Sequence, residues 1–88
     1  MEEITITPKD LANLRHMLGV RQDISQTKWG YRNHFAPAGK NIPSMERLAE
    51  AGLAVPGKPY LDSRFFHATR AGAELAGLAP EQINSLFV

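Results

Sequence analysis

The chain has 88 residues, a formal charge of +1 at pH 7 and no cysteine. A chain of this length forms one domain with one modest core, so we expect residues 1–88 to be a single domain. The missing cysteines exclude disulfides and thiolate chemistry, and the nearly neutral charge is not that of a protein whose whole surface binds nucleic acid. No apolar run approaches the ~20 residues of a membrane span, and the start MEEITIT lacks the features of a signal peptide. The sequence therefore predicts a cytoplasmic protein with no membrane partner.

The first two predicted elements are a short strand and a helix. Isoleucine and threonine alternate in residues 3–7, which is typical of a half-buried strand. The tetrapeptide Thr-Pro-Lys-Asp at 7–10 predicts a helix start, with threonine as the N-cap and proline at the first helical position. Leucines then recur at spacings of three and four up to Leu18, and Gly19 is placed to end the helix.

The following stretch, residues 20–41, has no clean hydrophobic period and is interrupted by glycine and proline. A short helix within Thr27–Phe35 would supply a middle helix of the domain. Tyr31 and Phe35 are four residues apart, so they would share one face of that helix. We therefore expect a short helix here, followed by a loop.

Two short antiparallel strands are predicted in the second half of the chain. Leu53 and Val55 alternate with other residues on the outgoing strand, and both are expected to face the core. Pro56–Gly57 would turn the chain. Phe66 and Ala68 alternate on the returning strand and are expected to face the same core.

Helices are predicted on both sides of these strands. Ser44 is placed to cap a helix over residues 44–51, and Gly52 is placed as its left-handed stop. Thr69 is placed to cap the next helix, with Gly72 at its third position. A glycine there would allow the helix to pack closely on the returning strand.

The order of these elements resembles the second half of a winged-helix domain. The matching features are a helix ending in Gly-Leu at 52–53, two strands that would form the wing, and a Thr-x-x-Gly helix start at 69–72. The resemblance implies an α+β, winged-helix-like small domain with three to five short helices and a two- to three-stranded antiparallel wing sheet, in which residues 3–7 would be the third strand. The predicted core comprises Ile6, Leu11, Leu14, Leu18, Phe35, Leu48, Leu53, Val55, Phe66, Ala68, Leu75 and Leu78.

A second resemblance covers most of the chain. The string LRHMLG at 14–19, the string YRNHF at 31–35 and the Gly-Leu and Thr-x-x-Gly elements together are similar to a group of small proteins encoded by tailed bacteriophages and prophages. The resemblance implies a bacteriophage or prophage origin and a location in the cytoplasm of the bacterial host. It implies no biochemical role.

The sequence does not predict catalytic or metal chemistry. Three histidines are present, His16, His34 and His67, but none is paired at the i, i+4 spacing of a helical metal site. No Ser, His and acid group has the spacing of a nucleophilic site, and no glycine-rich phosphate loop is present. We therefore expect no enzymatic activity, no metal or other cofactor and no small-molecule substrate.

A nucleic-acid interface is one functional hypothesis. Residues 21–40 contain four cations and a single acid, with Trp29 and Tyr31 among them, and such side chains contact phosphates and stack on bases. In a DNA-binding winged helix, the helix at 44–51 would enter the groove and the wing would add phosphate contacts. Glu46 and Glu50 oppose this hypothesis, because they make the outward face of that helix negative. The candidate nucleic-acid-binding residues are Arg21, Lys28, Arg32, Lys40, Arg47, Lys58 and Arg64.

A protein-interaction or phage-assembly module without nucleic-acid binding is the other hypothesis. Residues 79–81 predict the start of a last short helix with a small apolar face. That face either covers the core or is exposed for a partner or for self-association. The candidate interaction residues are Phe65, Ile83 and Phe87.

Overall fold

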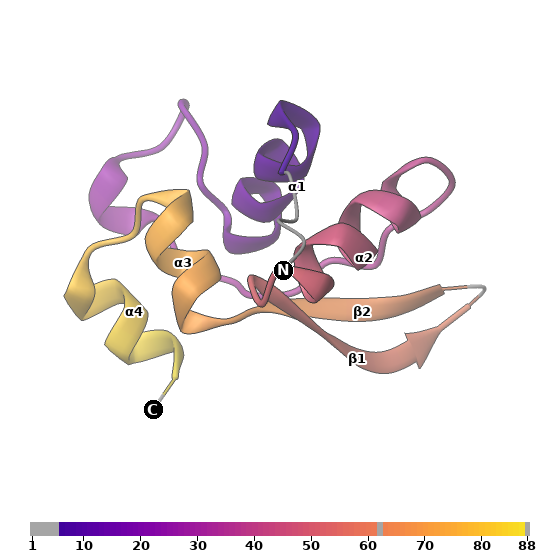
Figure 1. The fold of residues 1–88 in the computed structure, drawn as a ribbon. Helices are drawn as coiled ribbons and strands as arrows, with labels where there is room; N and C mark the ends of the chain where they lie inside the picture. The colour runs from indigo at the N-terminus through magenta and orange to yellow at the C-terminus, as the bar shows by residue number, and fades with distance from the viewer. Residues whose placement is uncertain (1–5, 62, 88) are drawn as a thin grey trace.

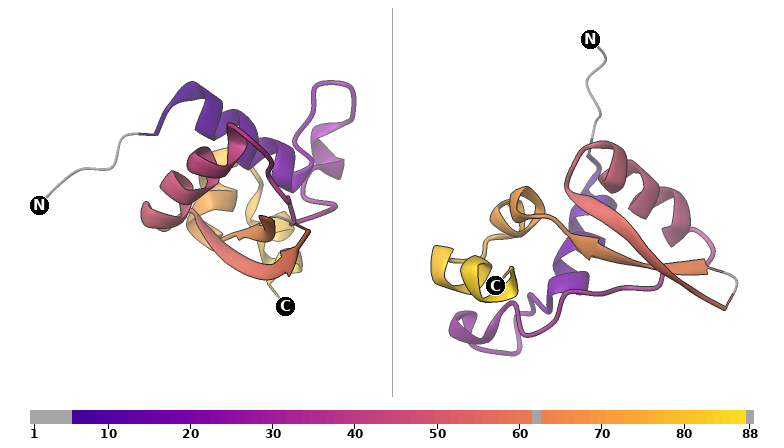
Figure 2. Two further views of the ribbon diagram at one scale, coloured as in Figure 1. Left: turned by 90° about the vertical axis from the view of Figure 1, so that its right-hand side faces the viewer. Right: turned by 90° about the horizontal axis from the view of Figure 1, so that it is seen from below.

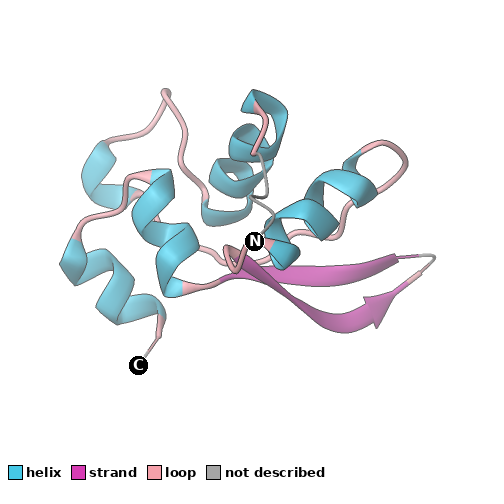
Figure 3. Cartoon of the chain, in the orientation of Figure 1, coloured by secondary structure: helices cyan, strands magenta, loops and turns pink. Residues whose placement is uncertain are grey.

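The computed structural model of the chain describes residues 6–61 and 63–87. Its helices and its two-stranded antiparallel sheet form the α+β, winged-helix-like arrangement expected from the sequence (Figures 1 and 3). The elements are α1 (Pro8–Leu18), the 3-10 helix η1 (Gln26–Lys28), α2 (Asn41–Glu50), β1 (Ala54–Tyr60), β2 (Ser63–Ala68), α3 (Arg70–Ala76) and α4 (Pro80–Leu86).

The core lies where three helices meet the root of the β1–β2 hairpin. Helix α1 contacts α2, α3 and β2, while α2 contacts β1, and α4 packs against α3 (Figures 1 and 2). The far end of the hairpin extends away from this core. The core residues with the least exposure are Leu14, Met17, Leu18, Met45, Leu48 and Ala73.

Helix α1 begins and ends as predicted. The Thr7 hydroxyl accepts a hydrogen bond from the Asp10 backbone N–H, and the Asp10 carboxylate accepts one from the Thr7 N–H, both at 3.1 Å. Gly19 ends the helix with φ +74°. The strand predicted at 3–7 falls largely outside the described residues, and Thr7 belongs to the helix cap rather than to the sheet.

Near the root of the hairpin, the free edge of β2 is covered at Phe66 and Ala68 by a segment that we expected to be helical. Phe35 and Phe66 exchange two backbone hydrogen bonds of 3.1 and 2.8 Å. The Asn33 side chain continues this pairing, because its amide bonds both the N–H and the C=O of Ala68, at 2.6 and 3.2 Å. The middle helix predicted within Thr27–Phe35 is therefore wrong beyond η1. Residues 33–35 form hydrogen bonds with β2 instead of helical ones.

Helix α2 begins at Asn41, three residues before the predicted start. The N–H groups of Asn41 and Ile42 donate to the carbonyls of Ala38 and Gly39, so the first turn is closed by the preceding loop. Ser44 is not the cap; it lies within α2, and its side chain is buried against α1. The predicted left-handed stop at Gly52 is confirmed by its φ of +78°.

The hairpin is longer than predicted. Strand β1 continues through Pro56–Gly57 to Tyr60, with a register shift between Pro56 and Pro59, so the turn predicted at 56–57 is wrong. The inward orientation of Phe66 and Ala68 is confirmed. Ala54 pairs with Ala68 and shares its buried face.

Val55 therefore lies on the opposite, outward face, because successive strand residues alternate. It is exposed, which makes its place in the predicted core wrong. Leu75 is also exposed, because α3 buries the side containing Ala73 and Ala76 instead. Of the remaining predictions, six are buried and four are partly buried: Leu14, Leu18, Leu48, Phe66, Ala68 and Leu78 in the first group, and Ile6, Leu11, Phe35 and Leu53 in the second.

Helix α3 confirms the predicted cap at Thr69 and the predicted close approach at Gly72, but not the expected neighbour of that glycine. The Thr69 hydroxyl accepts a 3.1 Å hydrogen bond from the Gly72 N–H. A Cβ atom on Gly72 would lie 2.1 Å from the carbonyl oxygen of Leu53, so only glycine allows this approach. The close contact is with the residue before β1, not with the returning strand as expected.

Candidate interaction surface

Arg47 belongs to a buried polar network between α1 and α2. Its guanidinium binds the Asp10 carboxylate through two hydrogen bonds of 2.9 and 2.8 Å. Asp10 has no exposed surface, and it also accepts from the Ser44 hydroxyl at 2.6 Å, while Ser44 accepts from Asn13 at 2.9 Å. The Arg47 and Ser44 hydrogen bonds hold the pKa of the Asp10 carboxyl well below its ordinary value, against the opposing effect of burial. Arg47 is therefore occupied in holding α2 against α1.

Two more of the candidate arginines have partners within the chain. Arg32 donates to the backbone carbonyl of His16 at the end of α1, at 3.1 and 2.6 Å. Arg21 forms an exposed ion pair with Asp23 through two hydrogen bonds of 2.8 and 2.5 Å. Burial, together with Arg32 and Arg21, lowers the pKa of His16, so that side chain adds little positive charge at neutral pH.

The four remaining candidates are exposed but lie at different ends of the molecule. Lys28 belongs to η1, whereas Lys58 and Arg64 belong to the hairpin and Lys40 precedes α2. Figure 1 and the right-hand view of Figure 2 place η1 and the hairpin end on opposite sides of the domain. The charges of residues 21–40 therefore do not form one patch.

Helix α2 lacks the features of a DNA-reading helix. Residues 29–40, which the structure describes throughout, contain no helix, so α2 is not the second helix of a helix-turn-helix. Glu46 and Glu50 are exposed on α2. The start of the helix also offers few donors to a phosphate, because the first two N–H groups are used by the loop and residue 43 is proline.

The three candidate interaction residues do not form a surface together. Ile83 is buried in the core, and Phe87 packs against it with Arg70 over its ring at 5.2 Å. Phe65 is on the hairpin, half-buried between the rings of Tyr60 and His34, at centroid distances of 4.8 and 5.9 Å. None of the three is a protruding apolar side chain.

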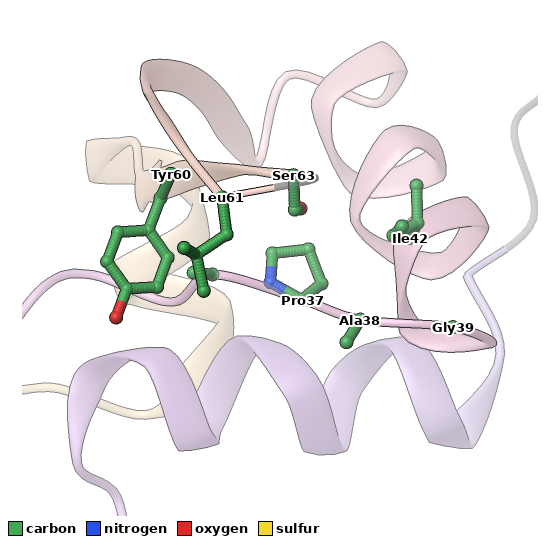
Figure 4. Close-up of a pocket in the computed structure, with 8 residues that line it drawn as sticks. Pro37, Ala38, Gly39, Ile42, Tyr60, Leu61 and Ser63 are labelled. Carbon is green, nitrogen blue, oxygen red and sulfur yellow. The ribbon is translucent and has the colours of Figure 1, made fainter.

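A different apolar surface lies at the hairpin end, which we define as residues 36–42 with 58–61 and 63–65. A hollow of about 310 Å³ separates the loop before α2 from the hairpin (Figure 4). Tyr60 and Leu61 lie on one side of it, and Pro37 and Ile42 on the other. The other lining residues are small, and Ser63 is the one among them with a polar side chain: Ala36, Ala38, Gly39 and Ser63. The surface of the hollow is therefore largely apolar.

Leu61 is the most unusual residue of this surface. Its side chain is 88% exposed. It is also the one non-glycine residue with positive φ in the described part of the chain, at +51°. A left-handed backbone is unfavourable for a bulky residue and favours glycine or asparagine. Leu61 was not among the residues predicted from the sequence, because the turn was expected at 56–57. A leucine at the true turn position is the signal that would have identified it.

The described residues provide no evidence for a metal site or a membrane span. No group of three or more His or carboxylate side chains among them is arranged to hold a metal ion. No helix in residues 6–61 and 63–87 has the length and hydrophobicity needed to cross a membrane. Comparisons of the chain with protein-family models, with curated proteins and with solved structures found no match.

Proposed function

We propose that the chain is a non-enzymatic protein-interaction module whose binding surface is the hairpin end. The main support is Leu61, which combines near-complete exposure with an unfavourable backbone conformation. Residues that violate local conformational preferences are concentrated at functional sites, because a residue needed for binding can be retained although it lowers the stability of the fold. The bacteriophage or prophage origin implied by the sequence resemblance is part of the same proposal.

A selection from a displayed random-peptide library tests this function. We expect peptides selected on the wild-type chain to compete with one another and to lose binding to Leu61→Asn. The matched control is Leu75→Asn, because Leu75 is an exposed leucine on α3, away from the hairpin end. Peptides that bind both variants as well as the wild type would contradict the proposal, and so would a selection that yields no binder.

Nucleic-acid binding is a second candidate function. It is favoured by the presence of Lys40, Lys58 and Arg64 in the hairpin end. Three phosphate contacts would weaken duplex binding by roughly one and a half decades between 50 and 200 mM salt. Fluorescence anisotropy with random duplex and single-stranded probes measures this, and Lys28→Glu at the opposite side of the domain is the charge-matched control for Lys58→Glu.

A further inference from the structure

Residues 32–35, which we call the edge segment, are held between β2 and α1. On one side, two residues of the segment are hydrogen-bonded to β2. On the other side, the Arg32 guanidinium donates two hydrogen bonds to the C=O of His16, at 3.1 and 2.6 Å. The His34 N–H adds a longer bond of 3.3 Å to the C=O of Met17. The cover of the β2 edge is therefore also attached to the last turn of α1.

The His16 side chain takes part in this attachment through its Nδ1 atom, which lies 3.4 Å from Nη2 of Arg32. A guanidinium can only donate hydrogen bonds, so Nδ1 has to accept, and it does so as the unprotonated nitrogen of a neutral imidazole. The His16 ring also packs edge-on against the ring of Phe35, with the centroids 5.0 Å apart. Neutral His16 therefore contacts both ends of the edge segment.

Protonation of His16 would make its contact with Arg32 repulsive. Nδ1 would then carry a hydrogen and face an N–H donor at 3.4 Å, and both groups would be positively charged. Two more arginines are near in the chain: Arg15 precedes His16, and the charge of Arg21 is offset by its ion pair with Asp23. Among residues 6–61 and 63–87, no carboxylate forms an ion pair with His16. The C-terminal end of α1 favours a cation, but Arg32 already occupies the C=O of His16.

The two other histidines also lie at the edge segment, but their contacts do not depend on charge in this way. His67 donates from Nδ1 to the C=O of Asn33 at 2.7 Å, and a charged imidazole donates as a neutral one does. His34 is exposed, and its ring lies edge-on against Phe65 with the centroids 5.9 Å apart. A response of the edge segment to pH is therefore assigned to His16.

We propose that the contact between His16 and Arg32 is a pH-sensitive switch that holds the edge segment over β2 at neutral pH and loosens it in mild acid. Burial, Arg32 and Arg21 lower the folded-state pKa of His16. The stabilisation from the contact is therefore complete above the ordinary imidazole pKa of about 6.5 and is lost as the pH falls below it. Loosening frees the edge groups of Phe66 and Ala68, and unpaired groups of this kind can pair with another strand. The switch does not depend on the proposed function, because it acts at the root of the hairpin.

Amide hydrogen exchange, measured by NMR on the full chain, tests the switch. The N–H groups of Phe35 and Phe66 report on the edge segment, because each donates to the C=O of the other residue. We expect their protection factors, corrected for the intrinsic effect of pH, to fall at least about threefold between pH 7.5 and pH 5.5. In His16→Gln the protection should stay constant over this range, because glutamine is neutral and still offers an acceptor to Arg32. The matched control is His34→Gln, which should keep the response of the wild type.

A second measurement tests the contact itself. The imidazole signals of His16 give its titration midpoint, and this midpoint should rise in Arg32→Gln, because the facing cation is removed. A midpoint that does not move would overturn the proposal, whether or not His16→Gln folds. So would protection factors that are the same at both pH values in the wild type. A fall in protection that persists in His16→Gln would show that another group titrates, and the switch would be wrong.

Discussion

At the contact between α1 and α2, a carboxylate with no exposed surface is bonded to an arginine, a serine and a backbone N–H. At the hairpin end, a leucine is 88% exposed on a backbone of positive φ, which is unfavourable for a bulky residue. Among the described residues, no buried side-chain nitrogen or oxygen lacks a hydrogen bond. In the packed centre, each buried polar side chain therefore has a hydrogen-bond partner. The hairpin end instead exposes an apolar side chain on an unfavourable backbone. This difference indicates that substitutions in the centre should change stability, whereas substitutions at the hairpin end should change binding.

The largest expected effect is at the root of the hairpin. Phe66 is 4% exposed in the core, so Phe66→Ala should lower the free energy of unfolding by about 3–5 kcal/mol. Phe65 is the matched control, because it is the adjacent phenylalanine on the outward face and is only half-buried. Urea denaturation measures both variants. Equal losses would contradict the side-chain alternation of β2.

The next largest effect concerns the polar network between α1 and α2. Asp10→Ala removes the acceptor of Ser44 and Arg47 and one half of the α1 capping box. We expect a loss of about 3 kcal/mol, because buried polar groups then lose their partners while Arg47 can still reach water.

The exposed Arg21–Asp23 pair supplies the control for Asp10→Ala. Solvent screens an ion pair of this kind, so Asp23→Ala should change stability little. Chemical denaturation of the two variants compares a buried carboxylate with an exposed one. Similar losses would contradict the assignment of Asp10 as the residue that holds the two helices together.

Acid sensitivity provides an independent test of the same carboxylate. The folded-state pKa of Asp10 is lowered, chiefly by the Arg47 hydrogen bonds. Its stabilisation is therefore complete above the ordinary carboxyl pKa of about 4 and is lost as the pH falls below it. Circular dichroism at fixed urea should show the wild type losing this stabilisation from about pH 4 downwards. The Asp10→Asn variant should show a shallower dependence, and an identical slope would contradict the assignment.

The helix ends were predictable from the sequence because their signals are local. Thr7, Thr69 and Gly19 act within a few residues of their own position, and each occupies the role that its sequence neighbours predicted. Ser44 shows the limit of this approach. It has the chemistry of a cap, but its hydroxyl donates to a carboxylate 34 residues away in the chain, which no local pattern reveals.

The hairpin and residues 33–35 were predicted wrongly, because their structure depends on strand pairing that the sequence does not display. Proline and glycine at 56–57 have strong turn preferences, yet β1 accommodates them at an irregular edge. Asn33 and Phe35 lie in a stretch without period, and their structure is imposed by β2. The candidate site was missed for the same reason, because a wrong turn position hides the exposure of Leu61.

The smallest expected effect on stability is the most informative about the hairpin end. Leu61→Asn replaces a bulky residue at φ +51° with one that tolerates the left-handed region, so it should raise stability by about 0.5–1 kcal/mol. Leu75→Asn should instead cost a few tenths of a kcal/mol, because asparagine is a poorer helix former than leucine. Thermal denaturation measures both changes. A gain in stability that accompanies the loss of peptide binding would show that the chain retains Leu61 for a partner and not for its fold. If Leu61→Asn destabilised the domain, the leucine would be a structural residue, and the main support for an interaction surface at the hairpin end would be lost.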